Sequence, residues 1–427
     1  MENLIIKNIH IIDPQNSRDE ISDIFIADGK IVSEDEFKRT FGEDHKDTVI
    51  DGTGLIAGPG FVDVHVHFRD PGQTHKEDIH TGAAAAMAGG VTSVVMMAHT
   101  VPPADDPDIV RDILERAAKE PIHIYTCATV TKGMGGKELC DYRALLDAGA
   151  VGFTDDGKPI TDEKLLSGAF EKISELGVPI SLHEEDPAYI KENGVNSGPA
   201  AASLGLTGSD RQAEISMIER DLAIAAKTDV KLNIQHISTA EGVEAVRRAR
   251  RDNRNIHAEA TPHHFTLTDS AVSVHGTLAK MNPPLRTDED REAIWEGLSD
   301  GTIDIIATDH APHSVEEKNV DFAHAPSGII GLETSFLLAY RTLVQRDIID
   351  LGRLFELMSL NPARLYGLNA GTLSVGAPAD IVIISPDEKT EYVTTRSRSS
   401  NSPFIGCTFE GKIRYTIADG RIVYSDR

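Results

Sequence analysis

The middle of the chain, residues 57–368, alternates between strand-like and helix-like segments. The first helix-like segment, Lys76–Ala88, contains four consecutive alanines and ends at Gly89-Gly90, as a helix should. Eight short apolar runs read as strands: Phe61–Val66, Gly90–Met97, Ile122–Cys127, Ala150–Phe153, Pro179–Leu182, Lys231–Gln235, Asn255–Ala260 and Ile303–Ala307. Strand–helix units repeated this often favour a (β/α)8 TIM-type barrel, with a doubly wound parallel sheet as the alternative.

Both ends of the chain are strand-rich and lack this alternation. Short apolar segments separated by Asp-Pro and Asp-Gly turns fill residues 1–56, and a similar pattern returns in residues 369–427. We therefore predict three segments: residues 1–56 and 369–427 form one small β-sandwich domain, and residues 57–368 form the barrel.

Polar side chains follow the predicted strands, at the C-terminal ends where barrel enzymes place their active sites. The first strand ends in His65-Val66-His67, and both imidazoles share one face because alternate residues of a strand point the same way. Further candidates at strand ends are Asp155, Asp156, His183, His236 and Asp309.

One histidine at a strand end is more often a hydrogen-bonded structural residue than a metal ligand. By default we interpret the following in that way: His99, His123, His263, His264 and His324. A converging set is different, because clustered imidazoles without a metal would leave donors unpaired in one small cavity.

Neutral imidazoles and carboxylates are good zinc ligands, so the set predicts a metal site. Counting one of the adjacent Asp155 and Asp156, the set offers six ligands, which exceeds the needs of one tetrahedral ion and makes two ions plausible. Such ions activate water at neutral pH, and the reaction class indicated is metal-assisted hydrolysis or its reverse.

The overall composition excludes several other classes of function. A formal net charge of -26 and a pI near 5.0 argue against nucleic acid and anionic membranes as partners. The three cysteines match no zinc or disulfide pattern, so we expect reduced thiols and a cytoplasmic protein. No apolar run approaches the ~20 residues that span a bilayer, and no export signal is visible.

The ordered motifs resemble the cyclic amidohydrolases and, within them, the short bacterial type I dihydroorotases. The similarity extends over nearly the whole chain, and four stretches show it best: GFVDVHVHFRDPGQT from Gly60, GFTDDG from Gly152, MNPPLR from Met281 and ATDHAPH from Ala307. The fold implied is the barrel with its β-sandwich. The reaction implied is the reversible, zinc-dependent cyclisation of N-carbamoyl-L-aspartate to L-dihydroorotate and water, in de novo pyrimidine (UMP) biosynthesis.

The resemblance also implies a role for each ligand. His65, His67 and Asp309 would bind one zinc ion, and His183 and His236 a second, if both are present. Asp156 would bridge them, where many relatives use a carbamylated lysine. Here Thr154 stands at the end of the fourth strand, and Lys158 comes only after the turn. Asp309 would also be the catalytic acid and base.

The expected substrate is a small anion. Arg69 offers a guanidinium that binds a carboxylate bidentately, with an ion pair to Asp70 as its alternative role. The resemblance assigns substrate contacts to Asn282 and His313 as well. Proteins of the family that this chain resembles usually have an asparagine at the position of His99. His99 could donate a hydrogen bond in place of that amide and, if charged, would suit an anion better.

Two other functions compete with this one. Another cyclic-amide hydrolase, such as a hydantoinase or allantoinase, usually has the bridging lysine. An inactive homologue could assemble with a pyrimidine enzyme such as aspartate transcarbamoylase, but it should have lost metal ligands. A homodimer is a further expectation from the family. Residues Ser314–Ala325 suggest a mobile loop, not a helix, serving either as a lid over the barrel mouth or as a plain surface loop.

Overall fold

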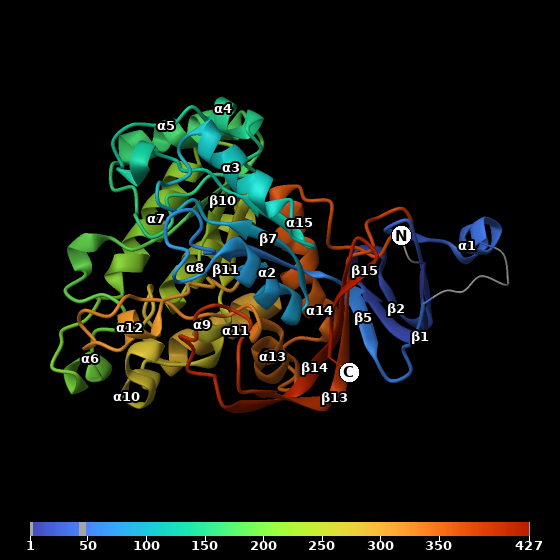
Figure 1. Ribbon diagram of the computed structural model, residues 1–427. Coiled ribbons are helices and arrows are strands. Elements are labelled where there is room, and N and C mark those ends of the chain that lie inside the picture. The colour runs from blue at the N-terminus through green and yellow to red at the C-terminus, as the bar shows by residue number, and fades with distance from the viewer. Residues whose placement is uncertain (1–2, 42–47, 427) are drawn as a thin grey trace.

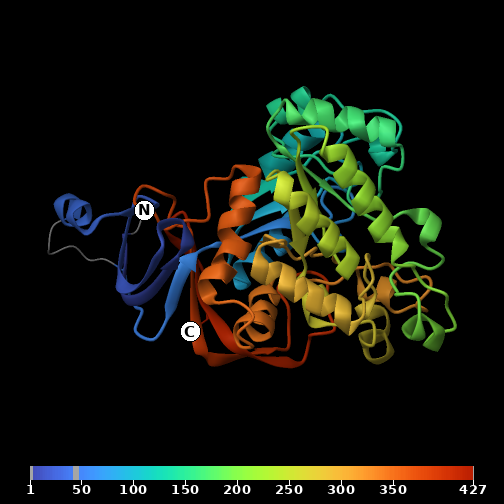
Figure 2. The same cartoon turned by 180° about the vertical axis from the view of Figure 1, so that it is seen from behind.

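The computed structural model describes residues 3–41 and 48–426. Figures 1 and 2 show a large unit in which helices surround strands, beside a smaller unit of strands that includes both terminal segments. The small unit lies on one side of the large one, next to α14 (Leu351–Phe355) and α15 (Asn361–Tyr366) (Figure 1).

The elements have the following bounds. The strands are β1 (Leu4–Asp13), β2 (Arg18–Ala27), β3 (Lys30–Val32), β4 (Thr48–Asp51), β5 (Ile56–Pro59), β6 (Phe61–Val66), β7 (Val91–Met96), β8 (His123–Thr126), β9 (Pro179–Leu182), β10 (Lys231–Ile234), β11 (Ile256–Ala260), β12 (Ile305–Ile306), β13 (Ile381–Tyr392), β14 (Cys407–Ala418) and β15 (Arg421–Ser425). The remaining α-helices are α1 (Glu34–Phe41), α2 (Ile79–Ala88), α3 (Pro107–Ala117), α4 (Tyr142–Asp147), α5 (Glu163–Ser174), α6 (Pro199–Ser203), α7 (Gln212–Ala225), α8 (Ala240–Asp252), α9 (Pro262–Thr266), α10 (Ala271–His275), α11 (Asp288–Asp300), α12 (Val315–Lys318) and α13 (Ser335–Ala339). Short 3-10 turns (Pro14–Asn16, Lys132–Met134, Pro187–Tyr189, Gly276–Ala279) and π-helical turns (Tyr340–Val344, Glu356–Leu360) complete the set.

Two parallel sheets form the wall of the barrel, in the orders β6-β7-β8 and β9-β10-β11-β12. Backbone bridges join them into a ring: Phe153 pairs with both Ala128 and Ile180, and His310 pairs with Val66. The predicted (β/α)8 barrel is thereby confirmed, and the C-terminal ends of its strands meet at one rim.

The fourth strand is shorter than predicted. Only Phe153 of the expected segment 150–153 pairs with both neighbours, although the amide of Val151 still donates to the Thr126 carbonyl. The chain turns away directly afterwards, since Asp155 accepts hydrogen bonds from the amides of Val130 and Thr131.

The first barrel helix, α2, begins three residues later than predicted. Asp78 caps it by accepting from the Thr81 amide, and the Thr81 hydroxyl completes the capping box. Lys76 and Glu77 consequently lie outside the helix, where they are buried beside the barrel rim.

The terminal strands form one eight-stranded sheet in the order β15-β14-β13-β5-β1-β2-β3, with β4 paired to β1. Segments from both ends meet where β5 pairs with β13 and with β1. Aliphatic side chains from both ends, such as Ile9, Ile26 and Ile381, bury a small core of their own. The predicted β-sandwich from both termini is confirmed.

Two features of the terminal unit were not predicted. Helix α1 packs Phe37 on β1 and β2. The connection 393–406 between β13 and β14 leaves the sheet and packs on the barrel, where Phe404 joins the main core. The boundaries at residues 56 and 368 stay predictions.

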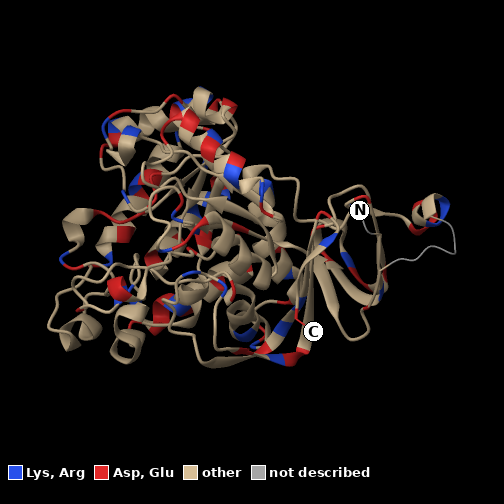
Figure 3. Ribbon diagram, in the orientation of Figure 1, with Lys and Arg blue, Asp and Glu red and all other residues tan. Residues whose placement is uncertain are grey.

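Asp and Glu are spread over the barrel helices, the loops and the terminal sheet, with Lys and Arg interspersed (Figure 3). Among the described residues, no helix is both long and apolar enough to cross a membrane. All three cysteines are free thiols, and Cys127 and Cys140 are buried.

Candidate active site

All six predicted metal ligands lie together at the rim of the barrel. Two overlapping groups of side chains present their ligand atoms within 4.8 Å of one another: His65, His67 and Asp309, and His65, Asp156 and His236. His183 lies beside the second group, with its Nδ1 2.9 Å from Nε2 of His236 and 3.7 Å from Oδ1 of Asp156.

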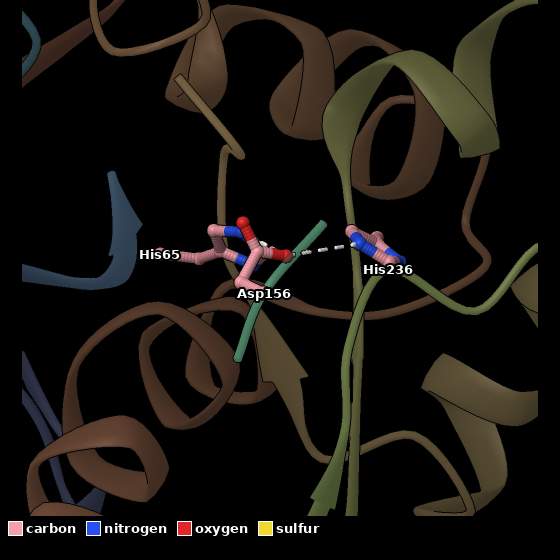
Figure 4. Close-up of side chains that lie close together, drawn as sticks. All are labelled: His65, Asp156 and His236. Atoms are coloured by element: carbon pink, nitrogen blue, oxygen red, sulfur yellow. Dashed lines mark ion pairs between the residues drawn. The ribbon is translucent and has the colours of Figure 1, made fainter. Parts of the chain in front are cut away.

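Asp156 occupies the centre of this arrangement. Figure 4 shows its carboxylate between the imidazoles of His65 and His236, which come from opposite walls of the barrel. Its oxygens lie 3.5 Å from Nε2 of His65, 3.2 Å from Nε2 of His67 and 3.6 Å from Nε2 of His236. The neighbouring Asp155 instead accepts backbone amides, so Asp156 is the aspartate that faces the imidazoles.

These separations fit metal ligands better than hydrogen-bonded pairs. Within residues 3–41 and 48–426, Nε2 of His65 is buried and has no hydrogen-bond partner. It lies 3.4 Å from Oδ1 of Asp309. Ligand atoms about 2.0–2.1 Å from a tetrahedral zinc ion lie about 3.3–3.4 Å apart, so the donor set fits such an ion.

Imidazoles and carboxylates in the cluster shift the pKa of one another. Burial raises the pKa of Asp309, but the imidazoles of His65 and His67 outweigh it and hold that pKa below its ordinary value. Burial lowers the pKa of His65, and the carboxylates of Glu259 and Asp156 outweigh that effect and raise it.

Three of the candidate residues adopt backbone conformations that are rare outside glycine. The φ angles of Arg69, His236 and Asp309 are 56°, 32° and 47°. Positive φ costs a non-glycine residue of order 1–3 kcal/mol and tends to occur at functional sites. Here each such residue ends or follows a strand, and its side chain lies at the rim.

Glu259 is a functional residue that the sequence reasoning missed. It lies fully buried on β11 and hydrogen-bonds Nδ1 of His65 through Oε1. Its other oxygen accepts from Asn233 at 3.1 Å. A carboxylate on the far nitrogen of a ligand histidine fixes the orientation and basicity of the ring. The signal in the sequence is a carboxylate within the predicted strand Asn255–Ala260.

Replacing Glu259 should therefore weaken metal binding. We expect Glu259→Gln to lower zinc affinity about 10–100-fold, because the amide no longer holds the ring as a charged acceptor. Competition against a chromophoric chelator measures this, with the exposed Glu219→Gln as control. Equal affinities in wild type and Glu259→Gln would contradict this role.

The cluster opens into a cavity of about 320 Å³. The four predicted substrate contacts all line it: Arg69, His99, Asn282 and His313. Asn193 and Ser327 line it too, and neither was predicted.

The chemistry of these lining residues suits an anion. Arg69 is buried and donates to the Pro312 carbonyl at 3.3 Å, while Asp70 pairs with Arg116 and leaves Arg69 free of it. Burial, followed by the charge of His67, lowers the pKa of His99 to about 4, so a neutral ring faces the cavity. Burial and Arg69 likewise lower the pKa of His313 to about 3.

The segment after His313 differs from the prediction. Residues 315–318 form the short helix α12, because Ser314 and Glu317 make a capping box, so the expectation of a loop without helix was wrong. Lys318, at the end of α12, is buried. Movement of this segment stays a prediction.

Comparison with known proteins agrees with this geometry. Residues 56–423 match the model of the amidohydrolase family. The chain is 49% identical over 422 residues to a dihydroorotase of Clostridioides difficile (strain 630), covering 99% of this chain and 100% of that one. A dihydroorotase of Streptococcus pneumoniae serotype 4 is 47% identical over 425 residues, with 99% of each chain covered.

Solved structures show the same fold. An L-hydantoinase from Arthrobacter aurescens superposes with a TM-score of 0.88 at 26% identity, covering 100% of this chain and 96% of that one. A dihydropyrimidinase from Brevibacillus agri gives 0.84 at 22% identity, with 99% and 95% covered. The family match over residues 56–423 and the relatives at 47–49% identity show that the chain belongs to the amidohydrolase family. The curated relatives that share nearly half of its residues over the full length are dihydroorotases.

Proposed function

We propose that this protein is a dihydroorotase, a cyclic-amide hydrolase that interconverts N-carbamoyl-L-aspartate and L-dihydroorotate in pyrimidine biosynthesis. One observation is central: two imidazole-carboxylate groups and the Arg69 guanidinium face a single cavity. Identity of 47–49% with dihydroorotases over nearly the whole chain supports it.

The metal centre holds one or two zinc ions in this proposal. His65, His67 and Asp309 would hold one ion, His183 and His236 would hold a second, and Asp156 would be shared between them. When bound, zinc activates water and polarises the ring carbonyl of the substrate. These ligands lie close together because β6, β9, β10 and β12 all end at one rim of the barrel.

Asp309 moves the proton in this account. In hydrolysis, water adds to the ring amide carbonyl, the bond from carbonyl carbon to ring nitrogen breaks, and a carboxylate forms with release of one proton to solution. Asp309 takes the proton from the attacking water and gives it to the departing nitrogen. In synthesis the same carboxylate removes the proton from the carbamoyl nitrogen, which attacks the side-chain carboxyl group of the substrate. One C–O bond of that group then breaks, and its oxygen leaves as water with the proton from Asp309 and a second proton from solution.

Four residues orient the anionic substrate. Arg69 binds its carboxylate bidentately, which a lysine could not do equally well. Asn282 and His313 contribute neutral hydrogen bonds, and His99 donates one where relatives use an amide. In a chain with a net charge of -26, Arg69 and the metal supply the local positive charge.

The competing assignment is another cyclic-amide hydrolase, since the superposed structures are hydantoinases and dihydropyrimidinases. Against it, no lysine occupies the bridging position at Thr154–Asp156. Purified protein should hydrolyse dihydroorotate at least about 100-fold faster than hydantoin or allantoin, the discrimination that correctly paired polar groups provide. Turnover of hydantoin with none of dihydroorotate would refute the assignment.

The remaining expectations belong to this proposal. The enzyme acts in the cytoplasm on a small anion, forms a homodimer, and is a candidate partner for aspartate transcarbamoylase. Sedimentation of the purified chain, alone and with that enzyme, tests the last two.

A further inference from the structure

The connection 393–406 between the last two long strands reaches back to the active-site rim. Its residue Asn401 is 3% exposed and lies against the chain that follows the barrel's last strand. The side-chain amide donates to the carbonyls of Ala311 at 2.9 Å and Gly328 at 3.0 Å, and its oxygen accepts from the His313 amide at 3.0 Å. One side chain of the terminal unit thus joins two backbone segments of the barrel.

Both of those segments line the substrate cavity. Ala311 and His313 belong to one, and Pro326, Ser327 and Gly328 form the other. Because a buried amide with all its partners placed allows little movement, these two segments keep one relative position.

A buried lysine holds the second segment from its other side. Lys318 is 4% exposed and donates to the carbonyls of Pro326 at 2.9 Å and Gly328 at 3.2 Å. Among the described residues no carboxylate pairs with it, and burial lowers its pKa to about 7. The Gly328 carbonyl therefore accepts from Asn401 and Lys318 together, and the Gly328 amide donates to the Lys280 carbonyl at 2.9 Å.

The segment held in this way contacts two of the proposed substrate ligands. The Ser327 carbonyl is 3.0 Å from Nε2 of His313 and accepts its proton in the tautomer protonated on that nitrogen. The Ser327 hydroxyl donates to Oδ1 of Asn282 at 3.0 Å. Movement of residues 326–328 would therefore release the His313 ring and the Asn282 amide, which both face the substrate.

Steric contacts restrict the position of residues 326–328. Gly328 has a φ of 149°, and a Cβ there would lie 2.6 Å from the Ala311 carbonyl oxygen and 2.9 Å from the His313 ring. The two segments are in direct contact only because residue 328 is glycine.

We propose that Asn401, with Lys318, is a positioning residue for substrate binding: it fixes His313 and the Ser327 segment against each other, so the terminal unit helps to shape the active site. This inference rests on the proposed function for its substrate. Neither side chain touches the metal ligands, so substrate affinity should change more than metal content.

The test compares Asn401→Ala, Asn401→Asp and Lys318→Met with the exposed Ser400→Ala as control. We expect KM for dihydroorotate to rise about tenfold in the first three, as loss of one or two buried hydrogen bonds implies. The kcat should fall much less, and zinc content should equal that of wild type. Asn401→Asp keeps the acceptor for the His313 amide but faces two carbonyls with an oxygen, so it should be at least as impaired as the alanine variant.

Hydrogen exchange supplies a second readout that needs no substrate. Amides in residues 311–313 and 326–330 should exchange faster in Asn401→Ala and Lys318→Met, while those of β6 do not change. The inference is overturned if KM and exchange both match wild type, or if metal is lost without a rise in KM. Failure of all three variants to fold would also overturn it, in favour of a purely structural role.

Different results would refute the proposed function and the positioning role of Asn401. A wild-type enzyme that does not turn over dihydroorotate refutes the proposed function, and exchange in the two segments then still decides whether Asn401 positions them. A wild-type enzyme with normal turnover, together with variants whose KM and exchange both match it, refutes the positioning role alone.

Discussion

Asp309→Ala should lose about 10²–10⁴-fold in kcat, the range expected when a general acid and base is removed. The loss has a second source, because Oδ1 of Asp309 lies 3.1 Å from Nε2 of His67 and 3.4 Å from Nε2 of His65, within the ligand group. The measurement is steady-state turnover of dihydroorotate in both directions, at known metal content per chain.

Two companion variants separate proton transfer from metal binding. Asp309→Asn keeps the shape and one oxygen but cannot accept a proton at neutral pH, so zinc-loaded Asp309→Asn should stay as inactive as the alanine variant. Asp321→Ala, which changes an exposed aspartate in the neighbouring segment, should keep normal turnover. Near-normal kcat in metal-loaded Asp309→Asn would exclude Asp309 as the acid and base.

Removal of the metal should abolish turnover altogether. Dialysis against a chelator should bring activity to background, and added zinc should restore it, because the remaining ligands do not activate water by themselves. The chain should also lose thermal stability, since an ion bound only by the folded state stabilises it by about 2.7 kcal/mol at a hundredfold excess over Kd.

Calorimetry of the metal-loaded, stripped and reloaded protein measures this second effect. A control with magnesium in place of zinc shows whether the site needs a metal that accepts imidazole. Full activity in protein shown by elemental analysis to be free of metal would contradict the account.

The sequence was most informative where topology decides the geometry. Strand ends of a parallel barrel must meet at one rim, so the strand-end positions alone group His65, His67, His183, His236 and Asp309. Asp156 could not be separated from Asp155 by physics alone. The structure separates them because Asp155 accepts backbone amides and Asp156 faces the imidazoles.

The residues that were missed act over long separations in the sequence. Glu259 supports His65 from a strand almost 200 residues away, and nothing in the local pattern of β11 shows which side chain it faces. Asn401 follows a strand of the terminal unit, where a polar run such as residues 397–402 is usually solvent-exposed. Only the fold reveals that four residues of this run are buried (Ser397, Ser399, Asn401 and Ser402), with Asn401 beside His313.

Local capping explains the shifted helix boundaries. Asp78 caps the N-terminus of α2, so the helix begins at Ile79 and does not include Lys76. Ser314 and Glu317 cap α12 inside a segment that was predicted to be a loop. The pair Ser314 and Glu317 matches the sequence pattern of a capping box, whereas Asp78 and Thr81 do not.

The most direct test of the metal centre is anomalous X-ray scattering from crystals, collected above and below the zinc absorption edge. The account predicts one or two peaks among His65, His67, Asp156, His183, His236 and Asp309, within about 2.0–2.2 Å of their ligand atoms. A map without such a peak, in crystals of active protein whose imidazoles hydrogen-bond to other groups, would contradict it.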